Sequence, residues 1–446
     1  MRAADAINLL QFLSPAADNE FINKLKTGKS GLLASEAENI LEQASQEDKD
    51  NVNILAKKII LKFELGHLTD VDLNQLIAAC LTVQRNANLA QTWQALYGNN
   101  QNNVKQPPQV GLPAESEMVI ENNLTPGWFK QRALLRLYVL NRQPEYYRNL
   151  LATIKSQTWN FVFKLAVLGI AGIVFGFAGL IVIVWQLFFF KKSSRLSDAA
   201  TAKYDWKLVF IVFYAWFCTQ LLFGIVIIWL KKINVINLSV GSHSFAAALS
   251  IALIYMLSNG PALLYIYFFA LKPQKLPFWQ GINFRLGSDI GGTFKLFGIA
   301  ILAWFAAIPL VLFAYLLSIK LFNCAGSSNP IIAIVMDAAK TDNFITILLF
   351  YLTLGILAPF VEESLFRGFF YTFLRGRYSA IFSNLLSSGL FALAHLDPGA
   401  VLPLFCLGSI FAYLVEITDS IVPAIIAHGL WNGCTFTLVL ILFGNF

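Results

Sequence analysis

Long apolar stretches fill most of the chain after about residue 160 and limit how it can fold. Eight of them are long enough, or nearly so, to cross a bilayer as a helix, which takes about 20 residues. They cover about 165–190, 208–230, 245–271, 296–319, 344–374, 380–396, 401–418 and 421–443. A helix pairs its backbone N–H and C=O groups within one segment, as the bilayer interior requires. The sequence therefore predicts an all-α fold, a polytopic transmembrane helical bundle of about eight spans with an N-terminal helical soluble domain.

Three of these stretches contain a proline, which removes a helix hydrogen bond and kinks or breaks the helix. The residues are Pro261, Pro309 and Pro359. The stretch 344–374 has two interpretations, because it is either one span or two segments hinged at Pro359.

The first 160 residues have a different composition, with 16 basic and 16 acidic side chains. Residues 1–96 are predicted to form a soluble helical domain, in which Thr69 and Asp72 make a capping box ahead of apolar residues at helical spacing. Residues 97–160 are predicted to be a linker rich in Asn, Gln and Pro, followed by a basic and aromatic juxtamembrane amphipathic segment. Residues 161–446 then form the transmembrane domain.

The net charge of +7 arises after residue 160, where basic side chains lie mostly between apolar stretches. Membrane loops have this pattern, so the charge does not indicate nucleic-acid binding. The expected partners are the lipid bilayer and a membrane-associated protein or peptide substrate, and no nucleic acid. Five cysteines without a CxxC pair argue against a disulfide framework or a thiolate metal site. The neutral helical head and the Asn- and Gln-rich linker favour a bacterial protein, in the plasma membrane.

Charged side chains occur inside one apolar stretch, in the segment APFVEESLFRGFF. A charge at the centre of a membrane helix costs at least about 2.5–3.5 kcal/mol, so three within six residues need an explanation. Glu363 and Arg367 are i, i+4 and are predicted to form an ion pair on one helix face. Glu362 points about 100° away and is left without that partner. The alternative is that both acids share Arg367 as a packing clamp.

Two of the four histidines, His395 and His428, fall within apolar stretches, and each has a companion at i, i+4 spacing. Phe391 precedes His395, and Asn432 follows His428. A lone histidine in an apolar helix is more often a hydrogen-bonded core residue. Here three helices each bring polar groups to a similar depth, and buried polar groups need one another as partners. We therefore expect Glu362, His395, His428 and Asn432 to line one cavity.

Such a set of side chains is suited to amide hydrolysis without a covalent intermediate. Glu362 and His395 can hold a water and take its proton, and His428 and Asn432 can donate hydrogen bonds to the oxyanion. A zinc site formed by Glu362, His395 and His428 is the main alternative. The HExxH motif is absent and the three ligands come from three helices, so the pattern favours a site without a cofactor while zinc stays possible. The GxSxG motif, which would indicate a serine nucleophile, is absent.

At these residues the sequence resembles the CPBP family, the CAAX proteases and bacteriocin-processing proteins of membranes. The family motifs EExxxR, FxxxH and HxxxN occur in order, beginning at Glu362, Phe391 and His428. The resemblance covers about 340–445. It implies a helical bundle around a polar cavity, with the first-motif glutamate and second-motif histidine activating water and the last-motif histidine and asparagine forming the oxyanion hole. Glu363, Arg367 and Phe391 would be supporting residues.

The expected function is an intramembrane endopeptidase that hydrolyses peptide bonds of membrane-associated proteins or peptides. Three alternatives stay open: a zinc-dependent metalloendopeptidase, a non-catalytic membrane binding or immunity protein that uses the same cavity, and a proton-relaying transporter. The absence of a visible internal repeat argues against the transporter.

Overall fold

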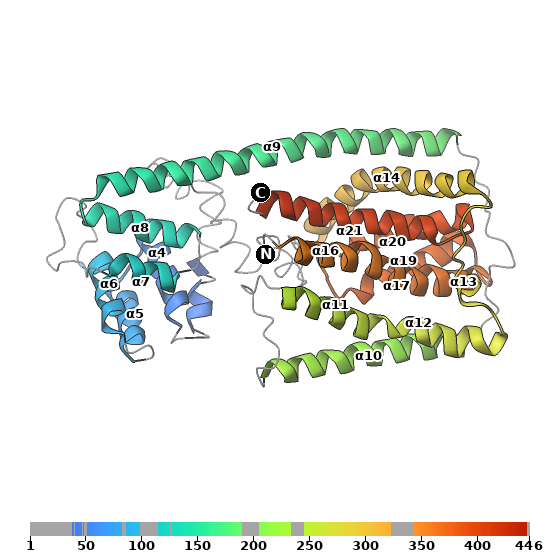
Figure 1. Cartoon of the computed structure of the whole chain (residues 1–446), viewed down its shortest axis with the longest axis horizontal. Coiled ribbons are helices and arrows are strands. Elements are labelled where there is room, and N and C mark those ends of the chain that lie inside the picture. The colour runs from blue at the N-terminus through green and yellow to red at the C-terminus, as the bar shows by residue number, and fades with distance from the viewer. Residues whose placement is uncertain are drawn as a thin grey trace. The chain divides into compact units, whose positions relative to one another are not determined.

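The computed structural model describes residues 38–39, 41–46, 48, 51–82, 86–98, 115–124, 127–189, 205–232, 245–322 and 343–443 (Figure 1). Throughout these residues the regular structure is helical and no strand occurs, which confirms the predicted all-α class. The chain divides into two compact units, Met1–Phe163 and Lys164–Phe446, which are described separately below.

The N-terminal unit packs a set of short helices around one apolar core. They are α4 (Val52–Leu65), α5 (Asp70–Thr82), α6 (Ala87–Tyr97), α7 (Ser116–Asn123), α8 (Trp128–Leu140) and the first turns of α9 (Pro144–Phe189). Leu76 and Trp93 are fully buried in this core. The predicted capping box starts α5, since the Thr69 N–H donates to Asp72 Oδ2 and the Asp72 N–H donates to Thr69 Oγ1, both at 3.3 Å.

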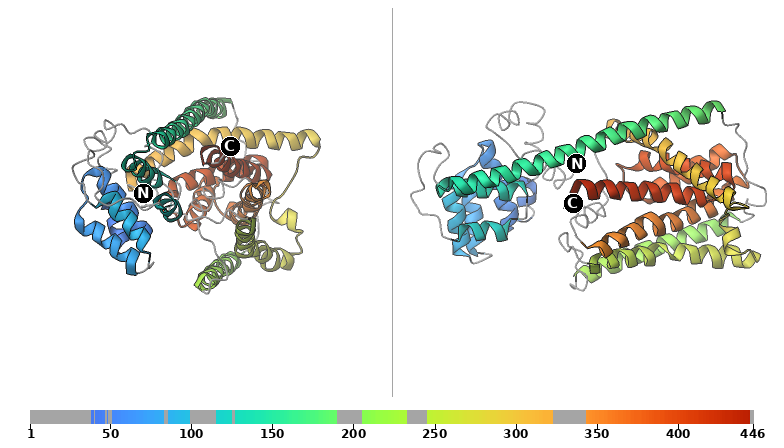
Figure 2. Two further views of the ribbon diagram at one scale, coloured as in Figure 1. Left: turned by 60° about the vertical axis from the view of Figure 1, so that its left-hand side comes forward. Right: turned by 45° about the horizontal axis from the view of Figure 1, so that its top comes forward.

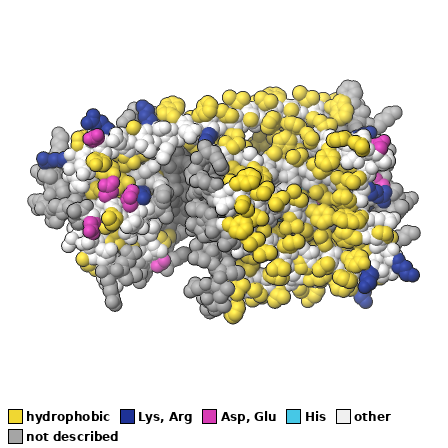
Figure 3. All heavy atoms as spheres, in the orientation of Figure 1, with side chains coloured by type: hydrophobic (Ala, Val, Ile, Leu, Met, Phe, Trp, Pro, Cys, Tyr) yellow, Lys and Arg dark blue, Asp and Glu magenta, His cyan; other side chains and the backbone are white. Residues whose placement is uncertain are grey.

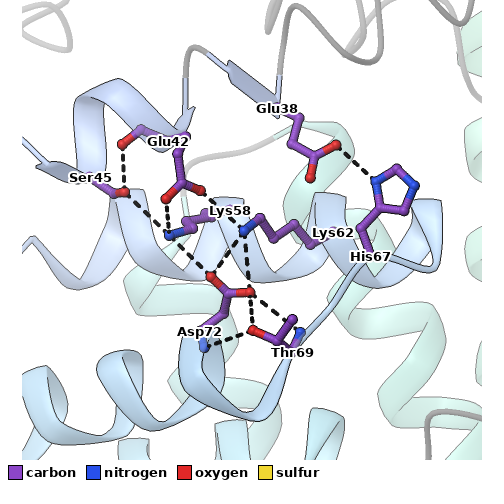
Figure 4. Close-up of polar contacts among 8 residues, drawn as sticks. All are labelled: Glu38, Glu42, Ser45, Lys58, Lys62, His67, Thr69 and Asp72. Atoms are coloured by element: carbon purple, nitrogen blue, oxygen red, sulfur yellow. Dashed lines mark hydrogen bonds and ion pairs between the residues drawn. The ribbon is translucent and has the colours of Figure 1, made fainter.

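Two lysines and two carboxylates tie α4 to its neighbours (Figure 4). Lys58 Nζ and Lys62 Nζ each lie 3.0–3.1 Å from oxygens of both Glu42 and Asp72. Burial on its own raises the pKa of Asp72, but hydrogen bonds from Thr69 and Lys62 outweigh it and hold that pKa below its usual value. Burial is likewise outweighed at Glu42, where hydrogen bonds from Lys58 and Lys62 lower the pKa.

The membrane unit is a helical bundle. Its α-helices are α9, α10 (Trp206–Lys232), α11 (Phe245–Asn259), α12 (Pro261–Tyr265), α13 (Phe278–Gly281), α14 (Ile290–Phe322), α16 (Phe344–Leu352), α17 (Ala358–Glu363), α18 (Thr372–Arg375), α19 (Ala380–Ala394), α20 (Val401–Thr418) and α21 (Val422–Phe443). Most of the longer ones run alongside one another, and α14 crosses them obliquely (Figure 2). Hydrophobic side chains cover the face of the unit drawn in Figure 3, as a surface in contact with lipid requires.

Among the described residues, seven helical stretches are long and apolar enough to span a membrane. They are Pro144–Phe188, Trp206–Leu230, Ala248–Gln274, Ile290–Phe322, Phe344–Arg375, Val401–Thr418 and Val422–Leu442. The eighth expected stretch forms α19, which is apolar but has 15 residues. A helix of that length rises about 22 Å, less than the roughly 30 Å of a hydrocarbon core. The protein is an integral, multi-pass membrane protein.

Pro359 does not divide the stretch that contains it. The run Phe344–Arg375 is continuous, and two π-helical segments, Thr353–Leu357 and Ser364–Tyr371, flank α17. A π-turn changes the hydrogen-bond register, so the missing N–H and the ring of Pro359 are accommodated without a break. Of the two interpretations of this stretch, the single span is the one observed.

The helices that carry the functional side chains pack closely. Gly408 of α20 lies against Ser388 of α19, where an added Cβ would come within 3.1 Å of the Ser388 Cβ and 2.9 Å of Arg367 Nη2. Only a residue without a side chain lets α19, α20 and the arginine meet here.

Candidate active site

Glu362 and two histidines from three helices surround one point. Glu362 lies on α17, His395 caps the end of α19, and His428 lies on α21. Glu362 Oε2 is 3.8 Å from His395 Nε2 and 3.9 Å from His428 Nε2. The side chains are 18%, 28% and 6% exposed, respectively. The structure thus brings together three of the four residues that the sequence placed in one cavity.

The two oxygens of the Glu362 carboxylate have different surroundings. Oε1 accepts a hydrogen bond of 2.9 Å from the hydroxyl of Tyr255 on α11. Oε2 is buried and has no hydrogen-bond partner among the described residues. Leaving a buried carboxylate oxygen unsatisfied is unfavourable, so a small polar group such as water is expected beside Oε2.

Tyr255 was not identified from the sequence. It lies on the same face of α11 as Ala248 and Ile251, which pack into an apolar cluster with α16 and α21 residues such as Phe350 and Phe436. This packing directs Tyr255 towards Glu362. The helical spacing of the three residues indicates a shared face, but nothing in the sequence says which carboxylate that face meets.

The backbone contact of His395 fixes its tautomer. His395 Nδ1 lies 2.8 Å from the carbonyl oxygen of Phe391. A carbonyl only accepts, so Nδ1 carries the proton and the neutral ring presents an unprotonated Nε2 to Glu362. The Phe391 ring packs edge-on against this imidazole, with centroids 4.8 Å apart. The Phe391–His395 pair of the second motif therefore orients one imidazole.

A fully buried group of charges holds the second histidine. Glu363 Oε1 accepts from Arg367 Nη1 at 3.0 Å and from His428 Nδ1 at 2.8 Å. Arg367 Nη2 also donates to the Gly408 carbonyl at 3.1 Å. The predicted Glu363–Arg367 ion pair is confirmed, with both side chains at 0% exposure. The alternative, in which Glu362 and Glu363 both bind Arg367, is not observed, because Arg367 makes no hydrogen bond or ion pair with Glu362.

Asn432 has a different partner from the one expected. It lies one turn after His428 on α21, and its Nδ2 donates to the Leu354 carbonyl at 3.0 Å. Leu354 belongs to the π-helical segment Thr353–Leu357, where the change of register alters the usual backbone pairing. One N–H of the Asn432 amide is used in this contact, and the second remains for another acceptor.

The donor set resembles zinc ligands in type but is wider in spacing. Nε2 faces Glu362 in both histidines while Nδ1 is held by a carbonyl or a carboxylate, as in metal-bound histidines. Ligand atoms on tetrahedral zinc lie about 3.3 Å apart, given bond lengths near 2.0–2.1 Å. The observed separations are 3.8 and 3.9 Å. In the part of the chain that the structure describes, no three His, Cys, Asp or Glu side chains lie close enough together to bind one metal ion.

The comparisons with known proteins bear on this same segment. Residues 344–434 match the family model described as Type II CAAX prenyl endopeptidase Rce1-like. The matched residues include Glu362, His395, His428 and Asn432, whereas Tyr255 lies outside them. No curated protein and no solved structure matches the chain. The match confirms, over these residues, the family read from the three motifs: the C-terminal membrane region carries a CPBP, or CAAX-protease, segment.

Proposed function

We propose that the protein is an intramembrane endopeptidase that hydrolyses a peptide bond in a membrane-associated protein or peptide, using water activated by Glu362 and His395. The observation that carries this proposal is the buried, unpartnered Oε2 of Glu362 beside two imidazole nitrogens. The family match supports a CAAX-protease-like activity at the level of the family. The location we propose is the plasma membrane of a bacterium.

The water would sit between Glu362 Oε2 and His395 Nε2. These atoms are 3.8 Å apart, too far for a direct hydrogen bond and close enough for one water to reach both at about 2.8 Å. Both atoms accept, so the water donates its two hydrogens to them and turns a lone pair outwards. As the water oxygen attacks the substrate carbonyl, Glu362 takes the proton. That proton then passes to the departing amine nitrogen as the C–N bond breaks.

Three further groups have supporting roles in this mechanism. Tyr255 holds Oε1 of Glu362, so that Oε2 stays directed towards the water. The contact of Nδ1 with Glu363 orients the His428 ring, and Nε2 of His428 donates to the oxyanion when that nitrogen carries a proton. The free N–H of Asn432 is the second oxyanion donor in our proposal.

The test is cleavage of a defined reporter by the purified full-length chain in liposomes. A suitable probe is a fluorogenic peptide ending in S-farnesyl-cysteine and three further residues, because the matched family is named for prenylated CAAX substrates. Cleavage that persists with a membrane-permeant chelator supports the metal-free mechanism. Loss of cleavage with the chelator and its return with Zn²⁺ would replace that mechanism by the zinc-dependent one. Binding of the reporter without cleavage would favour the non-catalytic alternative.

A further inference from the structure

A cavity of about 390 Å³ lies in the membrane unit between α9, α14 and α20, lined by none of the candidate active-site residues. Most of its wall is aliphatic, contributed by residues such as Val182, Leu302, Ala303, Leu310 and Leu414. This volume is within the roughly 300–1,000 Å³ range of small-molecule sites. An α-helix is about 10 Å across with its side chains, so a docking protein helix is far too large for it.

The polar groups in the wall are hydrogen-bond donors. Gln186 Nε2 donates to the Tyr413 hydroxyl oxygen at 2.6 Å, which leaves the hydroxyl hydrogen of Tyr413 to donate elsewhere. Lys295 lines the same cavity, is exposed, and has no carboxylate within 4.0 Å among the described residues. A lysine without a carboxylate partner suits an anionic group.

Lys295 lies at one end of the cavity, because it is the lining residue nearest the start of α14. At the other end of α14, Ser318 Oγ donates to the Gly399 carbonyl just before α20. The wall continues along α14 from Lys295 to Leu310, a rise of about 22 Å. One leaflet's hydrocarbon is roughly 15 Å deep, half of a core of about 30 Å. The wall is therefore long enough to lie along an acyl chain of one leaflet.

We propose that this cavity binds one acyl chain of an anionic membrane phospholipid, with the phosphate at Lys295. The aliphatic wall takes the chain, and Lys295 at one end takes the charged headgroup. The inference goes beyond the proposed peptidase activity and does not depend on it. A zwitterionic lipid would occupy the apolar wall equally well but would gain less from the cation, so headgroup preference is the signature of the site.

The first test measures lipid retention by native mass spectrometry. The full-length chain is released from nanodiscs that contain phosphatidylcholine and phosphatidylglycerol in equal amounts. We expect one phosphatidylglycerol to be retained preferentially. Lys295→Gln should reduce that preference about fivefold, the contribution of one lysine near an anionic surface. Equal retention of both lipids by the unmodified protein, or an unchanged preference in Lys295→Gln, would overturn the proposal.

Lys207→Gln is the matched control. Lys207 is an exposed lysine in the first turn of α10 and does not line the cavity. It lies at the same end of the bundle, because the neighbouring Trp206 packs on Phe373 near Arg375, and Arg375 pairs with Glu416 of α20. This variant should keep the full phosphatidylglycerol preference. A loss equal to that of Lys295→Gln would show a general charge effect instead of a site, and would contradict the inference.

A second variant tests the apolar part of the site. Ala306→Trp places a large ring in the cavity wall, and Ile301→Trp places the same ring on an exposed position of the same helix outside it. We expect the retained lipid to disappear in Ala306→Trp and to persist in Ile301→Trp. Retention of the lipid in a folded Ala306→Trp protein would contradict the proposed position of the acyl chain.

Discussion

At the scale of single residues, the contact between Tyr255 and Glu362 gives a direct prediction. Tyr255→Phe removes only the hydroxyl that holds Oε1 of Glu362. We expect kcat for the reporter peptide to fall about tenfold while KM changes little. A tenfold change corresponds to about 1.4 kcal/mol, near the low end of the free energy of one hydrogen bond to a charged group. Kinetics of the purified variant in liposomes measures both constants.

Tyr351→Phe is the control for this substitution. The Tyr351 hydroxyl makes a similar contact between helices, 2.8 Å from Thr437 Oγ1, without touching the candidate active-site residues. The variant should keep the kcat of the unmodified protein. If both substitutions lower kcat equally, or Tyr255→Phe changes KM alone, Tyr255 does not act through Glu362.

Arg367 is predicted to stabilise the folded protein. Its loss would leave the fully buried Glu363 without its cation and the Gly408 carbonyl without its donor. Breaking a buried ion pair by removing one partner costs about 3–5 kcal/mol. Arg367→Ala should therefore lower the thermal unfolding temperature and the yield of folded protein. The exposed Arg377 of the same region is the control, since Arg377→Ala should change stability little. Normal melting of Arg367→Ala would contradict this account.

Some site contacts were predictable from the sequence and others were not. The i, i+4 spacing of Glu363 and Arg367 predicted their ion pair, and the rarity of buried charge predicted that Glu362 and two histidines converge. The bond from His428 to Glu363 and the bond from Asn432 to the Leu354 carbonyl depend on how α21 packs against a π-helical segment. No local spacing encodes that register.

At the scale of elements, apolar length predicted the helices better than proline predicted their breaks. Among the residues that the structure describes, seven stretches are long and apolar enough to span, and α19 is shorter because its apolar run ends at His395, where the chain turns. Pro261 begins α12, where the first turn does not need its N–H. Pro309 lies inside α14 and Pro359 near the start of α17, and neither ends its span. In these helices a proline alters the backbone hydrogen bonding, but its position does not predict whether the helix ends there.

The contact of α4 with α5 predicts a pH dependence of the N-terminal unit. The pKa of Asp72 is lowered in the folded protein, so the unfolded chain binds a proton more readily. The stabilisation is present in full above the unfolded value near 3.8 and is lost as pH falls through the lower folded value. Asp72→Asn should therefore destabilise α4 and α5 at pH 6, and the difference from the unmodified protein should shrink as pH falls below about 4.

Hydrogen exchange of α4 and α5 peptides in the full-length chain, corrected for intrinsic exchange rates, measures this difference. Asp70→Asn is the control, because Asp70 lies in the same turn of α5 but is exposed and bonds neither lysine. A difference between Asp72→Asn and the unmodified protein that stays constant from pH 6 to pH 3 would contradict the assignment to this carboxylate.

At the scale of the whole molecule, the two units predict where the chain can be shortened. The core of the N-terminal unit joins α4–α6 to buried residues of α8 such as Phe129 and Leu137, so deleting only residues 1–95 would expose that core. Deleting 1–143 removes the helices up to the start of α9 at Pro144. We propose that the second truncation inserts and folds. Size-exclusion chromatography and thermal melting in detergent check this, and an aggregated product would show that the membrane unit needs the N-terminal unit.

The central claim is that Glu362 activates the water that hydrolyses the substrate. The most direct test is the reporter cleavage rate of Glu362→Gln, which keeps the shape of the side chain but cannot take the proton. We predict a fall of about 10²–10⁴-fold with reporter binding retained, while Glu145→Gln, at the start of α9, keeps the rate of the unmodified protein. A Glu362→Gln protein that cleaves the reporter at the unmodified rate would contradict the account.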